Sequence, residues 1–131
     1  MKSTLTERVR YKETDKMGRV YHANYFVWFD MARTEYLRER GISYKYLEET
    51  GLFFVVAKTD CSFKAPLEFD DWIEIETSLI EIKKVSVVFE YKVYHKESRR
   101  LIAVASTTLA AVDTQGKMMP IPDEVVKKLE E

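Results

Sequence analysis

The chain has 131 residues, of which 46% are hydrophobic and 33% are charged. This length suits one domain, and the composition excludes a collagen-like, low-complexity or disordered chain. The net charge of −1 leaves no bulk positive field. Binding of nucleic acid through mass electrostatics is therefore not expected.

The expected location follows from the cysteine count and from the apolar runs. One cysteine, Cys61, cannot form an internal disulfide, which favours a reducing compartment. The N-terminus has no apolar signal core, and no run reaches the roughly 18 apolar residues of a membrane span. We therefore expect a cytoplasmic protein without a membrane span.

The first third of the chain predicts a strand, a turn and a long helix. Residues 5–13 alternate apolar and charged side chains, as a strand does. Residues 14–18 then contain an aspartate and a glycine, which are typical of a turn. From Ala23 to Arg40 the period is helical, with Gly41 placed to end the helix. One face of this helix is expected to be buried, and it carries Tyr25, Phe29, Ala32 and Tyr36.

The rest of the chain predicts mostly strands. A short helix is expected between Ser43, its cap, and Gly51, its end. Strands are predicted over residues 53–64, 72–82, 85–95 and 101–112. The last of these is apolar on both faces and should lie inside the sheet. A final short helix begins near Ile121, with acidic residues in its first turn and lysines near its end.

This order of elements predicts an α+β fold over residues 1–131. Short connections make consecutive strands antiparallel neighbours. One long helix inserted early must then cover one face of that sheet.

Few side chains in the sequence are suited to chemistry. There are two histidines and one cysteine, and no spacing typical of a zinc site occurs. The serine-hydrolase motif GxSxG and the phosphate-binding loops are absent as well. Cys61 falls on the apolar phase of its strand, so we interpret it as a core residue and not as a nucleophile.

The segment from Asp15 to Tyr25 is the remaining candidate. A helix N-terminus offers unpaired N–H groups and a partial positive charge, which can stabilise an oxyanion. A carboxylate held beside it could act as a base or nucleophile on an acyl carbon. The alternative is purely local: Asp15 accepts hydrogen bonds in a turn, and His22 is an exposed cap residue.

The run Asp15-Lys-Met-Gly-Arg-Val-Tyr-His-Ala-Asn-Tyr25 resembles the signature of the hotdog-fold acyl-CoA thioesterases. Ala32–Glu35, Ala-Arg-Thr-Glu, also resembles the branch with the Tol-Pal-associated and 4-hydroxybenzoyl-CoA thioesterases. The resemblance implies a long helix wrapped by a curved antiparallel sheet. It also implies dimers that join their sheets edge to edge, further pairing into tetramers, and active sites at the dimer interface.

The resemblance implies roles for three residues near the helix start. Asp15 matches the catalytic carboxylate, which activates water or attacks the thioester to give a mixed anhydride. His22 matches the position whose backbone N–H binds the thioester oxygen and whose side chain can take part. Tyr11 matches a supporting tyrosine near the carboxylate.

The resemblance also implies a site for coenzyme A, which belongs to the substrate, so no separate cofactor is expected. Lys83 and Lys84 resemble basic positions that hold its nucleotide, and Ser86 lies where the pantetheine arm would pass. Tyr25 could help to close an acyl pocket. Further candidates for that pocket are Met17, Phe26, Phe53, Phe54, Phe63 and Trp72. For all of these, solvated charge or ordinary core packing is the alternative.

The sequence therefore predicts hydrolysis of a short- to medium-chain or aromatic acyl-CoA. Two alternatives stay open: a hydratase or dehydratase acting on acyl thioesters, and a non-catalytic module that binds acyl-carrier protein. His95, at a strand end, is expected to be exposed and without a role. Arg99 and Arg100 are expected to be exposed turn residues.

Overall fold

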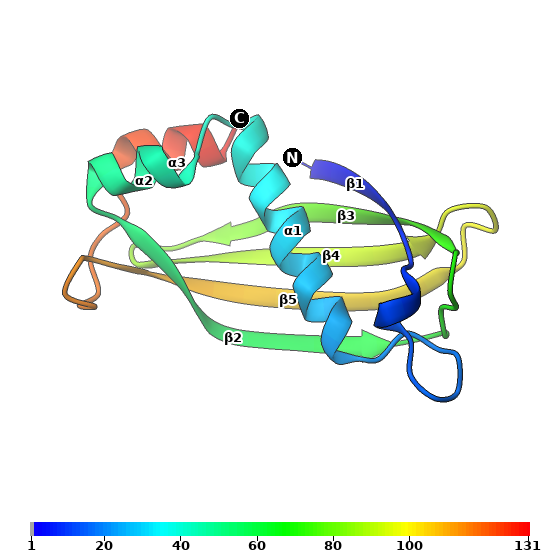
Figure 1. Cartoon of the computed structure of the whole chain (residues 1–131). Helices are drawn as coiled ribbons and strands as arrows, with labels where there is room; N and C mark the ends of the chain where they lie inside the picture. The colour runs from blue at the N-terminus through cyan, green and yellow to red at the C-terminus, as the bar shows by residue number, and fades with distance from the viewer. Residues whose placement is uncertain (1) are drawn as a thin grey trace.

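The predicted long helix is α1, which spans Ala23–Glu39 in the computed structural model. The structure describes residues 2–131. The helix buries the predicted face, formed by Tyr25, Phe29, Ala32 and Tyr36. It lies across one face of the sheet (Figure 1). The apolar period of the sequence therefore predicted correctly which side of the helix meets the core.

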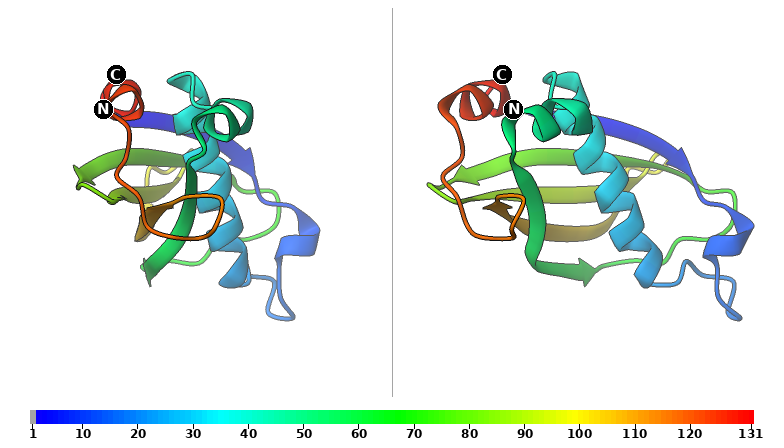
Figure 2. Two further views of the ribbon diagram at one scale, coloured as in Figure 1. Left: turned by 90° about the vertical axis from the view of Figure 1, so that its left-hand side faces the viewer. Right: turned by 60° about the vertical axis from the view of Figure 1, so that its left-hand side comes forward.

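The sheet has five strands, all in antiparallel pairs, in the order β1-β3-β4-β5-β2. Their bounds are Lys2–Arg8 for β1, Phe53–Phe63 for β2, Trp72–Ile82 for β3, Ser86–His95 for β4 and Leu101–Val112 for β5. Alternate side chains of the inner strands are buried beneath α1, and the sheet curves around the helix (Figure 2). The predicted α+β architecture, a helix wrapped by a curved antiparallel sheet, is confirmed.

The predicted first strand over residues 5–13 is wrong in its bounds. Pairing of β1 with β3 ends at Arg8, and Tyr11–Glu13 forms a short 3₁₀ helix, η1. The carboxylate of Glu13 accepts a hydrogen bond from the Arg10 amide at 2.7 Å. This bond closes the turn. The alternation of side chains in residues 9–13 therefore does not correspond to an extended strand.

The position of β2 also differs from the prediction. Residues 64–71 carry the chain away from β2, which pairs with β5 and not with β3. β5 is an interior strand, as predicted. The outer edge of β2 has no partner among residues 2–131, although side chains such as Val55 and Val56 on this strand are apolar and exposed. Unpaired apolar edges of this kind favour pairing with another strand.

Two short helices lie at the C-terminal end of α1 (Figures 1 and 2). Helix α2 is Tyr44–Thr50, capped by the Ser43 hydroxyl, which accepts from the Tyr46 amide, and ended by Gly51 at φ 72°. Helix α3 is Asp123–Leu129, and its last carbonyl accepts from the Tyr36 hydroxyl at 2.9 Å. No helix of the described residues is long and apolar enough to cross a membrane.

Candidate active site

The carboxylate of Asp15 is held in the loop between η1 and α1. Its Oδ1 accepts hydrogen bonds from the amides of Met17, at 2.8 Å, and Arg19, at 3.3 Å. Gly18 completes the turn at φ 78°, a backbone conformation that favours glycine. The side chain is exposed, and Oδ2 has no hydrogen-bond partner within residues 2–131. One oxygen therefore orients the group and the other is accessible.

The start of α1 lies beside this loop (Figure 1). The Tyr21 amide donates to the carbonyl of Glu13, and the Asn24 amide donates to the carbonyl of Tyr21. Between them, the amides of His22 and Ala23 find no acceptor in the described part of the chain. Such N–H groups carry the positive end of the helix dipole. The exposed imidazole of His22 makes no cap bond and lies against the ring of Tyr21.

Backbone hydrogen bonds close the loop on itself and connect it to the segment after β2. Thr14 and Val20 form a bridge, and the Asp15 amide donates to the Arg19 carbonyl at 2.7 Å. The Val20 amide also donates to Leu67, in the segment that follows β2. Among residues 2–131, no hydrogen bond or ion pair joins the side chains of Asp15 and His22. The carboxylate of Asp15 and the unpaired amides thus lie at the same end of α1, and among residues 2–131 no hydrogen bond joins them.

Glu13 also belongs to this region, although the sequence did not indicate a role for it. Glu13 is only 3% exposed, and its carboxylate accepts hydrogen bonds from Arg10 and from the indole of Trp28. Burial by itself raises the pKa of Glu13. The hydrogen bonds and the positive charge of Arg10 outweigh it and hold that pKa below the usual value. Glu13 is therefore a buried carboxylate that stays ionised.

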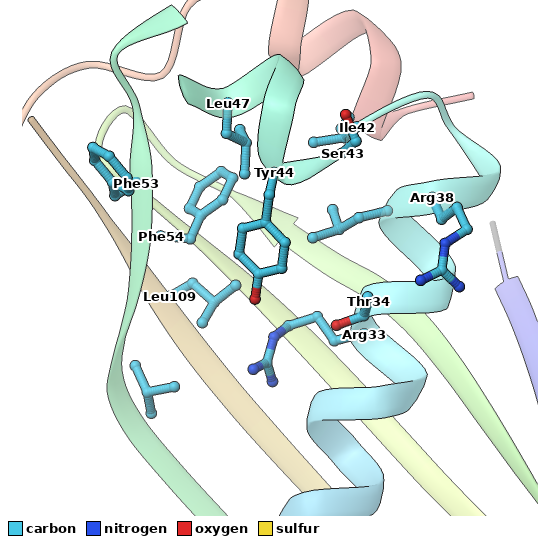
Figure 3. Close-up of a pocket in the computed structure, with 12 residues that line it drawn as sticks. Arg33, Thr34, Arg38, Ile42, Ser43, Tyr44, Leu47, Phe53, Phe54 and Leu109 are labelled. Atoms are coloured by element: carbon cyan, nitrogen blue, oxygen red, sulfur yellow. The ribbon is translucent and has the colours of Figure 1, made fainter. Parts of the chain in front are cut away.

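A cavity of about 230 Å³ lies between α1, α2 and β2 (Figure 3). Its apolar lining comes from Leu37, Ile42, Leu47, Phe53, Phe54, Val56 and Leu109. Arg33 and Tyr44 add polar groups, and the Tyr44 hydroxyl points toward Arg33 (Figure 3). Arg33 begins this lining 11 residues after His22, which is roughly 16 Å along the helix axis. Within one copy, the cavity and Asp15 thus belong to different ends of α1.

Arg33 keeps its charge at this cavity. Burial lowers the pKa of its guanidinium, but contacts with Tyr91 and Asp30 raise that pKa by more than burial lowers it, so the net shift is upward. Nη1 donates to the Tyr91 hydroxyl at 3.0 Å, and Nη2 donates to Asp30 at 2.6 Å. The cavity therefore combines an apolar wall with two permanently charged side chains, Arg33 and Arg38.

Comparison with known proteins gives the family. The family model of the thioesterase-like superfamily matches residues 9–129. The chain belongs to this superfamily. It is 37% identical over 121 residues to the acyl-CoA thioesterase YbgC of Haemophilus influenzae, covering 90% of this chain and 87% of that protein.

Two solved structures resemble the thioesterase closely. A hypothetical protein from Aquifex aeolicus has a TM-score of 0.90 at 35% identity, over 97% of this chain and 98% of that one. A DHNA-CoA thioesterase from Staphylococcus aureus has a TM-score of 0.88 at 28% identity, over 98% and 91%. The predicted hotdog fold and the predicted class of enzyme, an acyl-CoA thioester hydrolase, are confirmed.

The other predicted residues near the helix start have different surroundings in the thioesterase. Tyr11 is 76% exposed and packs edge-on against Phe69, with no hydrogen bond to Asp15. Tyr25 is buried against Trp28 and Phe63, and burial together with Cys61 raises its pKa to about 12. Neither residue lines the cavity. Their roles in the reaction stay predictions.

The predicted coenzyme A residues lie at the far end of the sheet from Asp15. Lys83 and Lys84 form the turn between β3 and β4, and β3 alone extends for about 35 Å. Lys83 is 3.0 Å from the carboxylate of Glu81. Ser86 is half-buried, and its carbonyl accepts from the Lys83 amide. One copy of the thioesterase therefore does not bring these residues to Asp15.

The remaining expectations concern His95, Cys61, the pair Arg99 and Arg100, and Trp72. His95 is half-buried and not exposed, because its Nε2 lies 3.5 Å from Asp71 and its Nδ1 accepts from the Ser98 amide. Burial and Asp60 raise the pKa of the Cys61 thiol to about 11, so it is no thiolate nucleophile at neutral pH. Arg99 and Arg100 are exposed in the turn between β4 and β5, as predicted. Trp72 does not line the cavity between α1 and β2.

Proposed function

We propose that this thioesterase hydrolyses acyl-CoA with Asp15 as the reacting carboxylate and the amides of His22 and Ala23 as oxyanion donors. One observation supports this assignment above all. A turn holds an accessible carboxylate oxygen at the same helix end where two backbone N–H groups have no acceptor among residues 2–131. Backbone N–H groups at a helix start have directions set by the fold, and donors positioned in advance stabilise developing charge.

The reaction needs no further group from the protein. In the first route, Asp15 takes a proton from water, and the resulting hydroxide adds to the thioester carbon. The oxyanion binds the helix amides and then re-forms the carbonyl as the C–S bond breaks and coenzyme A leaves as the thiolate. In the second route, Asp15 itself adds to the carbon, the C–S bond breaks as coenzyme A leaves as the thiolate, and water hydrolyses the resulting mixed anhydride. Label in Asp15 after a single turnover in ¹⁸O-labelled water identifies the second route with attack of water on the Asp15 carboxyl carbon, whereas attack on the acyl carbon puts the label into the product.

The free edge of β2 supports a dimer in which two copies pair through this strand. A two-fold axis places one residue of β2 opposite itself. With Thr59 on the axis, Lys58 lies opposite Asp60 of the partner subunit, and both charges are paired. With Lys58 or Asp60 on the axis, like charges would face each other, which is destabilising. Charge therefore favours the Thr59 register.

This register brings the cavity of one copy to the Asp15 loop of the other. β2 has a bulge between Val56 and Lys58, where two residues oppose one. Counted through the bulge, Phe54 lies opposite the partner's Phe63. Phe54 lines the cavity, while Phe63 leads into the segment whose Leu67 carbonyl binds the loop at Val20. The two-fold axis also moves the partner's Lys83 and Lys84 to the end where Asp15 lies, as coenzyme A binding requires.

The lining of the cavity supports the expected acyl group. Its walls are mostly apolar and include the rings of Phe53 and Phe54. Such a lining suits a short- to medium-chain acyl group or an aromatic ring. Of the similar proteins, one is named an acyl-CoA thioesterase and another a DHNA-CoA thioesterase, so both general and aromatic acyl-CoAs belong in the screen.

The test is a thiol-release screen over acyl-CoA chain lengths and aromatic acyl-CoAs, with the Asp15→Asn variant beside the native protein. We expect turnover to fall by about 10²- to 10⁴-fold, the usual contribution of a general base. Native-like turnover in the variant would refute the assignment of Asp15. Hydration of enoyl-CoA without thiol release would favour the hydratase alternative, and binding of acyl-carrier protein without any turnover would favour the non-catalytic one.

A further inference from the structure

We infer that Glu13 is a positioning residue of this active site, which holds the Asp15 turn in place against the start of α1. The inference rests on the function proposed for Asp15 and the helix amides. Glu13 itself is buried, so it acts through other residues and does not touch substrate.

The side chain of Glu13 connects η1 with the interior of α1. Its Oε1 accepts from the Arg10 amide at 2.7 Å. Its Oε2 accepts from the indole Nε1 of Trp28 at 2.8 Å and from the Arg10 guanidinium at 3.3 Å. Trp28 is itself buried, more than one turn inside the helix. The carboxylate thus ties the chain before the loop to a fixed point in the core.

The main chain of Glu13 holds the other side of the site. Its carbonyl accepts from the Tyr21 amide at 2.9 Å and from the Asn24 side chain at 2.9 Å. These two residues flank the free amides of His22 and Ala23. One residue therefore contacts both the entry to the loop and the first turn of the helix.

Asp15 follows Glu13 by two residues, with no flexible spacer between them. Thr14, the residue between, is fixed by its own hydroxyl, which donates to the Tyr11 carbonyl at 2.7 Å. A shift of Glu13 would move the carboxylate and the oxyanion donors relative to each other. Catalysis is sensitive to displacements of this kind, because small errors in geometry reduce turnover sharply.

The chemistry of the site requires a carboxylate of this length. Three N–H donors converge on two oxygens, which suits an acceptor-only group. A glutamine amide would present its own N–H₂ to one of those donors. An aspartate would keep the charge but lacks the methylene that reaches Trp28.

The experiment compares Glu13→Gln with Ile75→Val, a substitution on β3, where the side chain of Ile75 is fully buried in the core. Both proteins are assayed for thiol release at a temperature where circular dichroism shows them folded. We expect Glu13→Gln to lower kcat by 10-fold or more with KM changed less than 3-fold. Ile75→Val should keep the native kcat even where its Tm falls as much as that of Glu13→Gln. If Glu13→Gln does not fold, Glu13→Asp takes its place with the same expectation.

Two outcomes separate this inference from the proposed function. Native kcat in the Glu13 variant, together with loss of turnover in Asp15→Asn, refutes the positioning role alone and leaves Glu13 a purely structural residue. Native turnover in Asp15→Asn refutes the proposed function, whatever the Glu13 variant does.

Discussion

The proposed β2 pairing predicts that reversing one charge weakens the dimer and that exchanging both charges restores it. Lys58 and Asp60 pair with Thr108 and Ser106 of β5, which alternate with buried residues. Their side chains therefore share the outer face of the sheet, away from the cavity. Substituting Lys58→Asp changes this edge without altering any residue that lines the cavity.

The magnitude follows from the symmetry of the dimer. Opposite charges directly across two strands stabilise by about 0.2–1 kcal/mol, and like charges destabilise by a similar amount. Each dimer has two such pairs, so Lys58→Asp costs about 1–4 kcal/mol. Since 1.4 kcal/mol is tenfold in affinity, the dimer Kd should rise about 5- to 1,000-fold. Raising the salt concentration should reduce this difference, because the pairs are exposed.

The assay is sedimentation equilibrium over a range of protein concentrations, with thiol release measured at the same concentrations. Turnover per chain should fall together with the dimer fraction, because in the proposed dimer the cavity and Asp15 come from different copies. The double variant Lys58→Asp with Asp60→Lys should recover both. Lys117→Asp, in an exposed turn, is the control for the change in net charge.

Two results would refute the reasoning. A native dimer in Lys58→Asp would show that the edge of β2 is not the interface. A double variant as weak as Lys58→Asp would show that the interface is right and the Thr59 register wrong.

Three further predictions concern single residues. Asp15→Asn keeps the Oδ1 acceptor and should change the free energy of unfolding by less than about 0.5 kcal/mol, whereas Asp15→Ala, which loses both turn hydrogen bonds, should cost about 1–2 kcal/mol by chemical denaturation. Phe54→Ala enlarges the cavity, so the acyl-chain optimum in the thiol-release screen should move to longer chains, and an unchanged profile would exclude this cavity as the acyl site. The pKa of Glu13 is lower in the folded protein than the ordinary value of 4.5. Its contribution to stability should therefore be complete above that value and disappear as the pH falls through the folded pKa. Denaturation midpoints below pH 5 should accordingly fall more steeply for the native protein than for Glu13→Gln.

Local patterns predicted most of the elements correctly. The buried face of α1 follows from a 3.6-residue period, and the Ser43 cap and Gly51 end of α2 follow from the conformations those residues favour. The position of β2 could not be predicted in this way. Its pairing with β5 joins residues about 50 positions apart, and the length of the connection to β3 does not encode which edge the strand takes.

In the candidate site, too, local features could be predicted from the sequence and long-range contacts could not. Asp15 and His22 are close in sequence, so a turn and a helix start suffice to place them at one end of α1. The burial of Glu13 depends on Trp28, which lies 15 residues away. The sequence alone does not indicate that a glutamate beside a polar turn is buried. The position of Glu13, two residues before Asp15, becomes informative only once η1 is known.

The proposed division between copies explains why the sequence identifies the reaction more readily than the acyl group. The proposed reacting groups lie between Asp15 and Ala23, so one continuous segment supplies them. The cavity combines residues of α1, α2, β2 and β5, and in the proposed dimer it serves the Asp15 of the other copy. Specificity therefore depends on long-range packing and on the β2 pairing, so substitutions at Phe54 or Leu109 can change the preferred acyl group while the segment around Asp15 stays the same.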